Sequence, residues 1–530
     1  MKNLKKKLTA GILVGTMLFG AVAGCGNKSE KQPAQEKEKE TSSTADSMTI
    51  AVTSFADTLE PTEQYFSWVV ERYGVGETLV KFDEKGEITP CLAESWDNSE
   101  DGLTWTFQIR KNVTFSNGDA MTPEMVKASL ERTFQKSDRA VSFFEPKSIE
   151  VEGQNLKITT KEPVATLPGS LADPLFLIVD TAVDDSKFAM EGPVCTGPYI
   201  VESFEPTASC VVVRNENYWG GTVPMKKVEL KCVDDQTTRA MALQSGEVQV
   251  AYNLKTENLV DFEGNPDYQI EKLDSLRSTY AFMNQNGPLA DITLRKAVIM
   301  AMDRESYVKK LLDGGATEGK APVPPTLDYG FDELVDENAY DMEGAKALLK
   351  EGGYVDVNKD GYVETPDGKP LELNFVIYTS REELNVYAQA AQASLKKIGV
   401  KLTLQVVSYE TLLDIRDSGS YDLLIWNVLV ANTGDPEKYL RENWYSTSAS
   451  NTMGYSNKKV DQYLDELLVE FDEEKRKELI VKIQQEIMND AATVFFGYET
   501  TYLISSSKVS GLKLYPMDYY WLTKDVALAK

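Results

Sequence analysis

The chain has 530 residues, 42% of them hydrophobic, a size and composition that predict two or three globular domains rather than a single core. Its formal charge of −27 disfavours contact with phosphate backbones, so no nucleic-acid partner is expected. The absence of histidine excludes Ser-His-Asp and Cys-His catalysis and histidine-liganded metal sites, whereas paired carboxylates among the 83 acidic residues leave hydrolysis formally open.

Residues 1–24 have the pattern of a secretory signal peptide. A basic start, Met1–Lys7, precedes an apolar run, Leu8–Ala23, that is too short to span a bilayer comfortably, and Val22-Ala23-Gly24-Cys25 closes the segment. Cys25 resembles the lipidated cysteine of a bacterial lipobox; the alternative is a plain signal peptide with an incidental cysteine. The sequence therefore predicts a lipid anchor on Cys25 and a location at the outer face of the bacterial cytoplasmic membrane.

Residues 25–47 are predicted to be the lipidated cysteine and a flexible tether. After Cys25 this segment is polar, charged and free of aromatic residues, so it cannot bury a core. The later cysteines form no CxxC pair, which argues against a thiolate metal site and leaves disulfides or buried free thiols open. These cysteines are Cys91, Cys195, Cys210 and Cys232.

From Met48 onward the pattern is mixed α and β. Short alternating strands are predicted at Met48–Thr53, Leu103–Arg110 and Asn155–Thr160. A helix is predicted over Pro123–Thr133, because Thr122 stands at the cap position and proline occupies the first turn. These elements favour an α/β fold.

Several later helices are expected to cover the sheets. One begins after a capping aspartate, carries apolar residues as far as Val308 and is closed by Gly314. The others have the same pattern of a capping side chain followed by an apolar stripe. The four predicted caps are Asp291, Asp341, Asn457 and Asp472.

Residues 356–367 match the start of a calcium-binding loop. Asp356, Asn358 and Asp360 alternate before a glycine, and Glu364 and Asp367 stand at later ligand positions. Closely spaced oxygen ligands suit a hard cation, but the twelfth position is Asp instead of Glu, and a strand follows instead of a helix. The segment therefore has two possible interpretations: a loop that binds a structural calcium ion, or a simple polar turn.

Leu371–Val430 gives the clearest pattern in the chain. Strand, helix, strand, short helix and a nearly continuous apolar strand follow one another, which predicts a parallel sheet with right-handed crossovers. Ligands of such open sheets bind beyond the carboxyl ends of the strands. Those ends are Tyr378–Arg381, Val407–Tyr409 and Trp426–Asp435.

An ordered set of short phrases resembles the family 5 extracellular solute-binding proteins of bacterial ABC importers. The resemblance covers Met48–Lys530. Each phrase is weak alone, and their order makes the set specific. The phrases include Ala93-Glu94-Ser95-Trp96, Asp101-Gly102-Leu103-Thr104-Trp105, Thr196-Gly197-Pro198-Tyr199, Arg214-Asn215-Glu216-Asn217-Tyr218-Trp219 and Leu243-Gln244-Ser245-Gly246-Glu247-Val248.

The resemblance implies a periplasmic-binding-protein type II-like fold: two mixed α/β lobes around a cleft, plus an inserted lobe. It places lobe I in residues 48–85, 195–273 and 490–530, lobe II in 86–194 and lobe III in 274–489. A solute is expected to be enclosed between lobes I and III by hinge closure and delivered to the ABC permease and ATPase subunits. The family implies a monomeric binding protein, not an enzyme, and no cofactor.

The resemblance also points to candidate ligand-binding residues. Related nickel-chelate binders place an arginine near Arg139, whose guanidinium can hold a carboxylate or simply be solvated. Arg381 meets an anion at a strand end or lies exposed in the first turn of a helix, and Trp426 lines the site or belongs to the core. The other candidates are Phe55, Tyr65, Phe66, Tyr280, Asn284, Asn427, Asn432 and Asp435.

One departure from the family bears on the ligand. Peptide-binding members resembling this chain carry an aspartate three residues after the tryptophan, which pairs with the peptide amino group. Here Leu429 stands three residues after Trp426. A short peptide or peptide-like solute remains the leading expectation, with a nickel or metallophore chelate as the alternative. A surface hydrolase that uses two carboxylates is a remote alternative, and a sensory role is a further one.

Overall fold

The computed structural model of this protein describes residues 46–53, 56–254, 256–378 and 381–529. Thr44–Lys530 forms one compact unit, and all that follows concerns the described part of it. The predicted signal peptide, Cys25, most of the tether, and Phe55 lie outside the described residues. None of the described helices combines the length and apolar character needed to cross a membrane.

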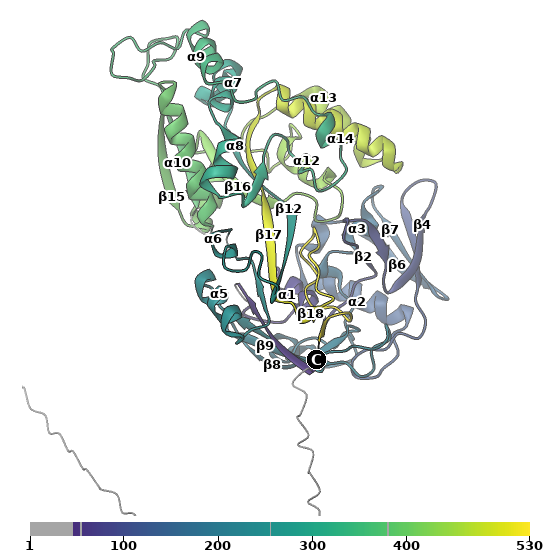
Figure 1. Ribbon diagram of the computed structural model, residues 1–530. Helices are drawn as coiled ribbons and strands as arrows, with labels where there is room; N and C mark the ends of the chain where they lie inside the picture. The colour runs from purple at the N-terminus through teal and green to yellow at the C-terminus, as the bar shows by residue number, and fades with distance from the viewer. Residues whose placement is uncertain (1–45, 54–55, 255, 379–380, 530) are drawn as a thin grey trace, which may run out of the picture. The chain divides into compact units, whose positions relative to one another are not determined.

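Eleven strands form one large mixed sheet (Figure 1). One strand, β13 (Ala316–Glu318), pairs with the edge of β17. The others follow the order β15 (Lys401–Val407), β14 (Glu372–Tyr378), β16 (Leu423–Leu429), β12 (Tyr268–Met283), β17 (Thr493–Ser506), β11 (Val250–Tyr252), β1 (Ser47–Val52), β10 (Lys227–Cys232), β9 (Ser209–Arg214) and β8 (Tyr199–Glu205).

The predicted strand–helix alternation over Leu371–Val430 is confirmed. β14 pairs in parallel with both β15 and β16. Between them run α10 (Glu382–Lys397) and α11 (Tyr409–Ser418). The apolar stripe of α10, including Leu384 and Leu395, is buried, so the helix is held against the sheet by apolar packing.

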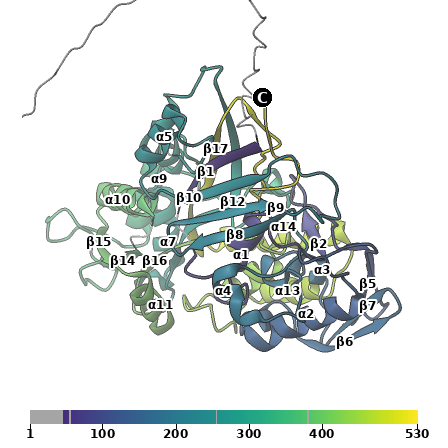
Figure 2. The ribbon, with the colours of Figure 1, turned by 90° about the horizontal axis from the view of Figure 1, so that it is seen from below.

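Two long antiparallel strands, β12 and β17, connect the two ends of the large sheet. They contain 16 and 14 residues and pair along most of their length. Figure 2, seen from below, shows β1, β10, β9 and β8 succeeding one another beside them. The register of the β12–β17 pair shifts between Asp274 and Ser278 of β12. Irregularities of this kind bend strands and redirect side chains.

A separate four-stranded antiparallel sheet is formed within residues 93–160. Helix α2 (Pro123–Lys136) packs against it, and its first turn begins at Thr122, whose hydroxyl accepts a hydrogen bond from Met125 N (3.4 Å). The predicted helix start is therefore confirmed, and the helix runs three residues beyond Thr133. The strand order is β4 (Ala93–Asn98), β5 (Thr104–Ile109), β7 (Asn155–Thr160) and β6 (Pro146–Glu152).

All four predicted helix caps accept a hydrogen bond from the first turn of their helices. The helix after Asp291 is shorter than predicted: it ends at Met300, because Asp303 caps a new turn by accepting Ser306 N. The helices are α7 (Ile292–Met300), α9 (Met342–Glu351), α13 (Lys458–Leu468) and α14 (Glu473–Asn489), with α8 (Arg304–Ser306) and a π-helical turn (Tyr307–Leu311) after α7.

Candidate functional site

Polar side chains from three neighbouring strands and from the start of α10 meet near the ends of the parallel strands. Asn427 in β16 lies opposite Thr279 in β12, and Glu499 in β17 lies opposite the irregular stretch of β12. Arg381 stands at the start of α10, directly after β14. We call this group the arginine cluster; its members are Arg277, Thr279, Arg381, Glu383, Asn427 and Glu499.

The Glu499 carboxylate is the central acceptor of the arginine cluster. Arg381 Nη1 donates to Glu499 Oε2 at 3.1 Å, and Thr279 Oγ1 donates to Oε1 at 3.3 Å. Asn427 Nδ2 also donates to Glu499 Oε1, while its Oδ1 accepts a bond from Arg277 Nη1 at 3.0 Å. The amide of Asn427 therefore fixes the position of the Arg277 guanidinium.

The charges of the cluster are not balanced at neutral pH. Glu383 Oε1 lies 3.6 Å from Arg381 Nη1, yet burial and the neighbouring Glu499 raise the pKa of Glu383 to about 7. Burial and the like charge of Arg381 lower the pKa of Arg277. Two guanidinium groups thus share one carboxylate and a second carboxyl that is partly protonated near pH 7.

Aromatic side chains continue the surface next to the cluster. The rings of Tyr378 and Tyr409 are 5.5 Å apart, and those of Tyr409 and Trp426 are 6.3 Å apart. The Arg416 guanidinium lies 5.1 Å from the centre of the Trp426 ring. Trp426 therefore keeps part of its surface outside the core and contributes a face for planar or cationic groups.

A second aromatic and cationic surface comes from the segment before α1 (Ser67–Arg72). The Arg139 guanidinium lies 3.9 Å from the centre of the Tyr65 ring and donates to the Gln64 carbonyl. Burial, then the proximity of Tyr65, raises the pKa of Tyr409, so the two exposed tyrosines lie near each other. Three segments that are far apart in the sequence thus bring Tyr65, Arg139 and Tyr409 into one region.

A cavity of about 270 Å³ lies between residues 142–170 and the helix α12 (Glu437–Trp444). Lys438 Nζ donates to Ser142 Oγ at 3.0 Å and lies 4.4 Å from the centre of the Phe143 ring. Arg441 pairs with Glu437 at 2.7 Å. Lys438 also pairs with Glu442 at 3.8 Å, and Arg476 pairs with Asp435 at 2.9 Å, so the charged side chains of this cavity are already paired.

Two predicted ligand residues pack inside the protein. Tyr280 is fully buried, and its ring packs against the rings of Phe282 and Trp444. Asn284 is also buried, and its amide donates to the carbonyls of Gly419 and Tyr421 at 3.0 and 2.8 Å. Neither side chain reaches a surface where a solute can bind, because both are used in strand and turn packing.

Three more candidates also hold structure together. Asp435 pairs with Arg476 at 2.9 Å, and both side chains are largely buried. The Asn432 carbonyl accepts the Tyr519 hydroxyl at 3.3 Å. Phe66 is partly buried against the apolar core near β1. The loop after β16 is therefore anchored by its own contacts, which leaves Asp435 unavailable as an anchor for a ligand amino group.

The acidic loop at 356–364 directs its oxygen atoms toward its own backbone. Asp356 accepts bonds from the N–H groups of Lys359 and Gly361, at 2.7 and 3.0 Å. Glu364 accepts from Val357 N and Asn358 Nδ2, both at 2.7 Å. No group of three His, Cys, Asp or Glu side chains among the described residues could hold a metal ion, so this geometry does not support the calcium prediction for Asp356, Asn358, Asp360 and Glu364.

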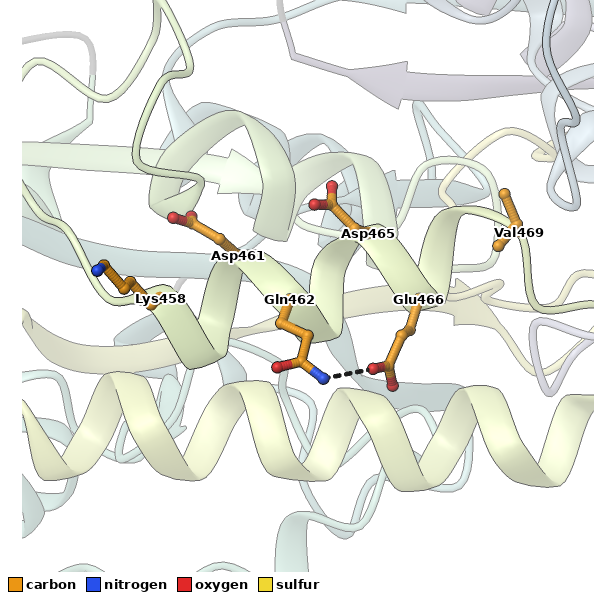
Figure 3. Close-up of a pocket in the computed structure, with 6 residues that line it drawn as sticks. All are labelled: Lys458, Asp461, Gln462, Asp465, Glu466 and Val469. Atoms are coloured by element: carbon orange, nitrogen blue, oxygen red, sulfur yellow. Dashed lines mark hydrogen bonds between the residues drawn. The ribbon is translucent and has the colours of Figure 1, made fainter.

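A shallow hollow on α13 is lined by polar side chains (Figure 3). Its side chains are bonded to each other or to nearby residues: Gln462 Nε2 donates to Glu466 at 2.8 Å, and Asp461 accepts Ser446 N at 2.8 Å. This hollow is a solvated helix face.

The four later cysteines are free thiols, three of them buried.

Sequence reasoning missed four members of the arginine cluster, Arg277, Thr279, Glu383 and Glu499, and the first and last of these are the most distant in sequence. These two lie in long strands whose ends belong to different parts of the sheet, and 221 positions separate them in the sequence. The available signal was the presence of charged residues within strand-like runs, and the run that holds Arg277 carries several. Such a residue is more often a solvated one, so the sequence alone could not single out this pair.

The match to a family model identifies the class of protein. Residues 87–451 match the model described as bacterial extracellular solute-binding proteins, family 5 middle. The chain therefore belongs to the family 5 extracellular solute-binding proteins, and the predicted family and fold class are confirmed. Members of this family serve ABC importers for peptides or nickel chelates.

Named relatives cover most of the chain. It is 26% identical over 494 residues to the probable D,D-dipeptide-binding periplasmic protein DdpA of Escherichia coli (strain K12), covering 89% of this chain and 92% of that protein. It is 25% identical over 461 residues to the nickel-binding protein NikA of Staphylococcus aureus, covering 86% and 89%. A crystal structure of a nickel ABC transporter from Bacillus halodurans has a TM-score of 0.78 at 29% identity, covering 91% of this chain and 100% of that one.

Proposed function

We propose that this protein captures a short peptide or peptide-like solute bearing a carboxylate and delivers it to the permease and ATPase subunits of an ABC importer. The observation that carries this proposal is the meeting of guanidinium and aromatic groups at the carboxyl ends of β14 and β16. Guanidinium groups bind carboxylates with two parallel hydrogen bonds, and aromatic faces accept peptide side chains.

A nickel or metallophore chelate is the second candidate. It is favoured by the pairing of Asp435 with Arg476, because a carboxylate held in this ion pair is not available to a peptide amino group. The names of the relatives support both solutes. A chelate whose ligands carry carboxylates would use the same arginine side chains.

Calorimetry separates the two solutes. Purified protein without residues 1–25 is titrated with pools of di- to pentapeptides and with nickel–histidine complexes, and released products are monitored in parallel. We expect saturable binding of one class without turnover. Steady product release, or the absence of binding by every pool, contradicts the proposal.

The proposal includes a lipid anchor at Cys25, residence at the outer face of the cytoplasmic membrane, and a monomer that closes between lobes I and III. The polar segment after Cys25 supports a tether of this kind. In the native host, Cys25→Ala is expected to move the protein from the detergent phase to the aqueous phase. Equal partitioning of both forms argues against the anchor.

A further inference from the structure

Phe471 packs against a sheet that is far from it in the sequence. It lies between α13 and α14, and the centre of its ring is 6.1 Å from that of Trp105 in β5. Figure 1 shows these helices next to the sheet that holds β4 and β5. The family resemblance assigns Phe471 to lobe III and Trp105 to lobe II. The contact therefore joins two segments that are assigned to different lobes.

The turn before β5 provides a fixed surface for the Phe471 ring. Gly102 in this turn has a φ of +67°, and a Cβ atom added there would lie 2.6 Å from Phe471 Cζ. Gly102 N donates to the Ser99 carbonyl at 2.8 Å. Trp105 is buried, and its indole N–H donates to the Val164 carbonyl at 2.9 Å. The surface under the ring is thus held by its own hydrogen bonds and has no room for a side chain at Gly102.

The position of Phe471 next to α14 explains why its ring packs on the sheet. It directly precedes Asp472, the cap of α14, and an apolar residue at this position commonly packs against the fourth residue of the helix. That fourth residue is Arg476, which donates to the carbonyls of Leu467 and Glu470 at 2.6 and 2.7 Å. Arg476 offers no apolar partner, but it fixes the backbone that carries Phe471. The ring is therefore directed toward the sheet.

A second close approach joins the same two lobes. Gly169 in α3 (Leu167–Ser170) lies against the loop after β16, where a Cβ atom added to it would overlap the Thr433 carbonyl oxygen. Neither this contact nor that of Phe471 uses a member of the arginine cluster or of the neighbouring aromatic surfaces. Both contacts therefore depend on the distance between the lobes and not on the chemistry of the solute.

Lobe II is joined to lobe I by backbone hydrogen bonds. Ile178 N donates to the Glu77 carbonyl at 2.9 Å, and Ser116 N donates to the Cys195 carbonyl at 2.8 Å. Among the described residues, no backbone hydrogen bond connects lobe II to lobe III, and the joint consists of side-chain and apolar contacts. A hinge motion that moves lobe III away from lobe I would thus leave lobe II with lobe I and break the Phe471 contact.

We propose that Phe471 is a latch that holds lobe III closed on lobe II. The inference rests on the closing motion of the proposed function, and it names a residue that controls this motion without touching the solute. When the ring lies on Gly102 and Trp105, the closed form gains an aromatic contact that the open form lacks. Apparent affinity is proportional to the fraction of protein in the binding-competent form, so the latch also strengthens retention of the solute.

Small-angle X-ray scattering without added solute tests the latch directly. The protein without residues 1–25 is first dialysed in urea to remove any co-purified solute and is then refolded. The wild type should scatter as a closed molecule, and Phe471→Ala should shift to a larger radius of gyration. Gly169→Ala should cause the same shift by another route, because its methyl group meets the Thr433 carbonyl only when the lobes are closed. Both variants should keep the far-ultraviolet circular dichroism of the wild type.

Phe134→Ala is the matched control. Phe134 is also partly buried, but the centre of its ring lies 5.1 and 5.7 Å from those of Phe144 and Phe176, both within lobe II. Its loss should lower the unfolding midpoint and leave the radius of gyration unchanged. The latch is overturned if Phe471→Ala scatters as the wild type does, or if Phe134→Ala opens the protein equally.

Solute binding provides an independent measurement. If a peptide pool or a nickel–histidine complex binds the wild type, Phe471→Ala should weaken that binding roughly 5-fold or more, mainly through faster dissociation. Equal affinity of the two proteins overturns the latch. Unchanged scattering with intact solute binding removes the latch and leaves the proposed function standing. If no solute binds the wild type, the proposed function is removed, and the scattering comparison still decides for or against the latch.

Discussion

At the scale of single residues, Glu77 is a largely buried carboxylate with three donors. Thr196 Oγ1, Tyr218 OH and Trp219 Nε1 each donate to it at 2.8 Å. Burial raises the pKa of Glu77, and these hydrogen bonds oppose that rise. The carboxylate thereby connects residues 196–199 (TGPY) with residues 214–219 (RNENYW). Both segments carry the family resemblance, and their shared acceptor explains why these polar residues occur there.

Replacing Glu77 by alanine should destabilise the protein by about 3 kcal/mol, because one buried donor and two partly buried donors lose their shared acceptor. The free energy of unfolding is measured in urea. Glu216→Ala is the control, since its side chain is mostly exposed and pairs with Arg214; we expect a change within about 1 kcal/mol. Similar losses for both variants would show that the three hydrogen bonds carry no special stability.

Glu383 makes stability depend on pH. Burial, with the charge of Glu499, raises the pKa of Glu383 from 4.5 to about 7 in the folded protein. A group with a raised folded pKa contributes stability that is fully present below the unfolded value and is lost as pH rises through the folded value. The contribution of Glu383 should therefore decline between about pH 4.5 and pH 7.

Glu383→Gln tests this dependence, because glutamine has the same shape and no charge. Relative to the wild type, the variant should gain roughly 2 kcal/mol of unfolding free energy between pH 5 and pH 8. Urea unfolding of both proteins at four pH values provides the comparison. Parallel stability curves for the two proteins would refute the assignment of this titration to Glu383.

At the scale of elements, the loop after β16 is fixed by a salt bridge. Asp435 bonds to Arg476 at the start of α14, and its second oxygen accepts Glu437 N at 2.8 Å, which starts α12. One carboxylate thus joins a loop and two helices. The sequence predicted a ligand contact for Asp435 because this residue follows a strand end. In the structure its carboxylate instead bonds to α12 and α14.

Asp435→Asn should cost about 3 kcal/mol, because it leaves the largely buried Arg476 without its counter-charge. Chemical unfolding measures the loss. Asp328→Asn provides a comparison, since Asp328 pairs with Lys477 but its side chain is almost fully exposed. If solute affinity at the arginine cluster falls while stability is unchanged, Asp435 contacts the solute after all.

Local sequence patterns predicted elements better than they predicted the site. The β14–α10–β15–α11–β16 alternation and the helix caps follow from periodicity and capping, which act within a few residues. Strand ends directed attention to Arg381 and Asn427, which the structure places in the arginine cluster. The partners of these residues come from β12 and β17, and no local rule relates Arg277 to Glu499, because their presence in one cluster depends on strand order and on a register shift.

At the scale of the whole molecule, the two exposed tyrosines offer a measure of closure. Tyr65 and Tyr409 are 59% and 47% exposed, lie near each other, and belong to segments assigned to different lobes. A solute that binds both surfaces favours the closed form by its differential contacts with the two states. Closure would bury both rings.

Nitration by tetranitromethane, mapped by mass spectrometry, should therefore slow severalfold at Tyr65 and Tyr409 when a binding peptide pool or nickel–histidine complex is present. Tyr340 is the internal control: it is 47% exposed, like Tyr409, and precedes α9, which packs on α7. Its reaction should be unchanged by solute. Equal protection of all three tyrosines would indicate general stabilisation, and protection of none would mean that the solute binds without bringing the two surfaces together.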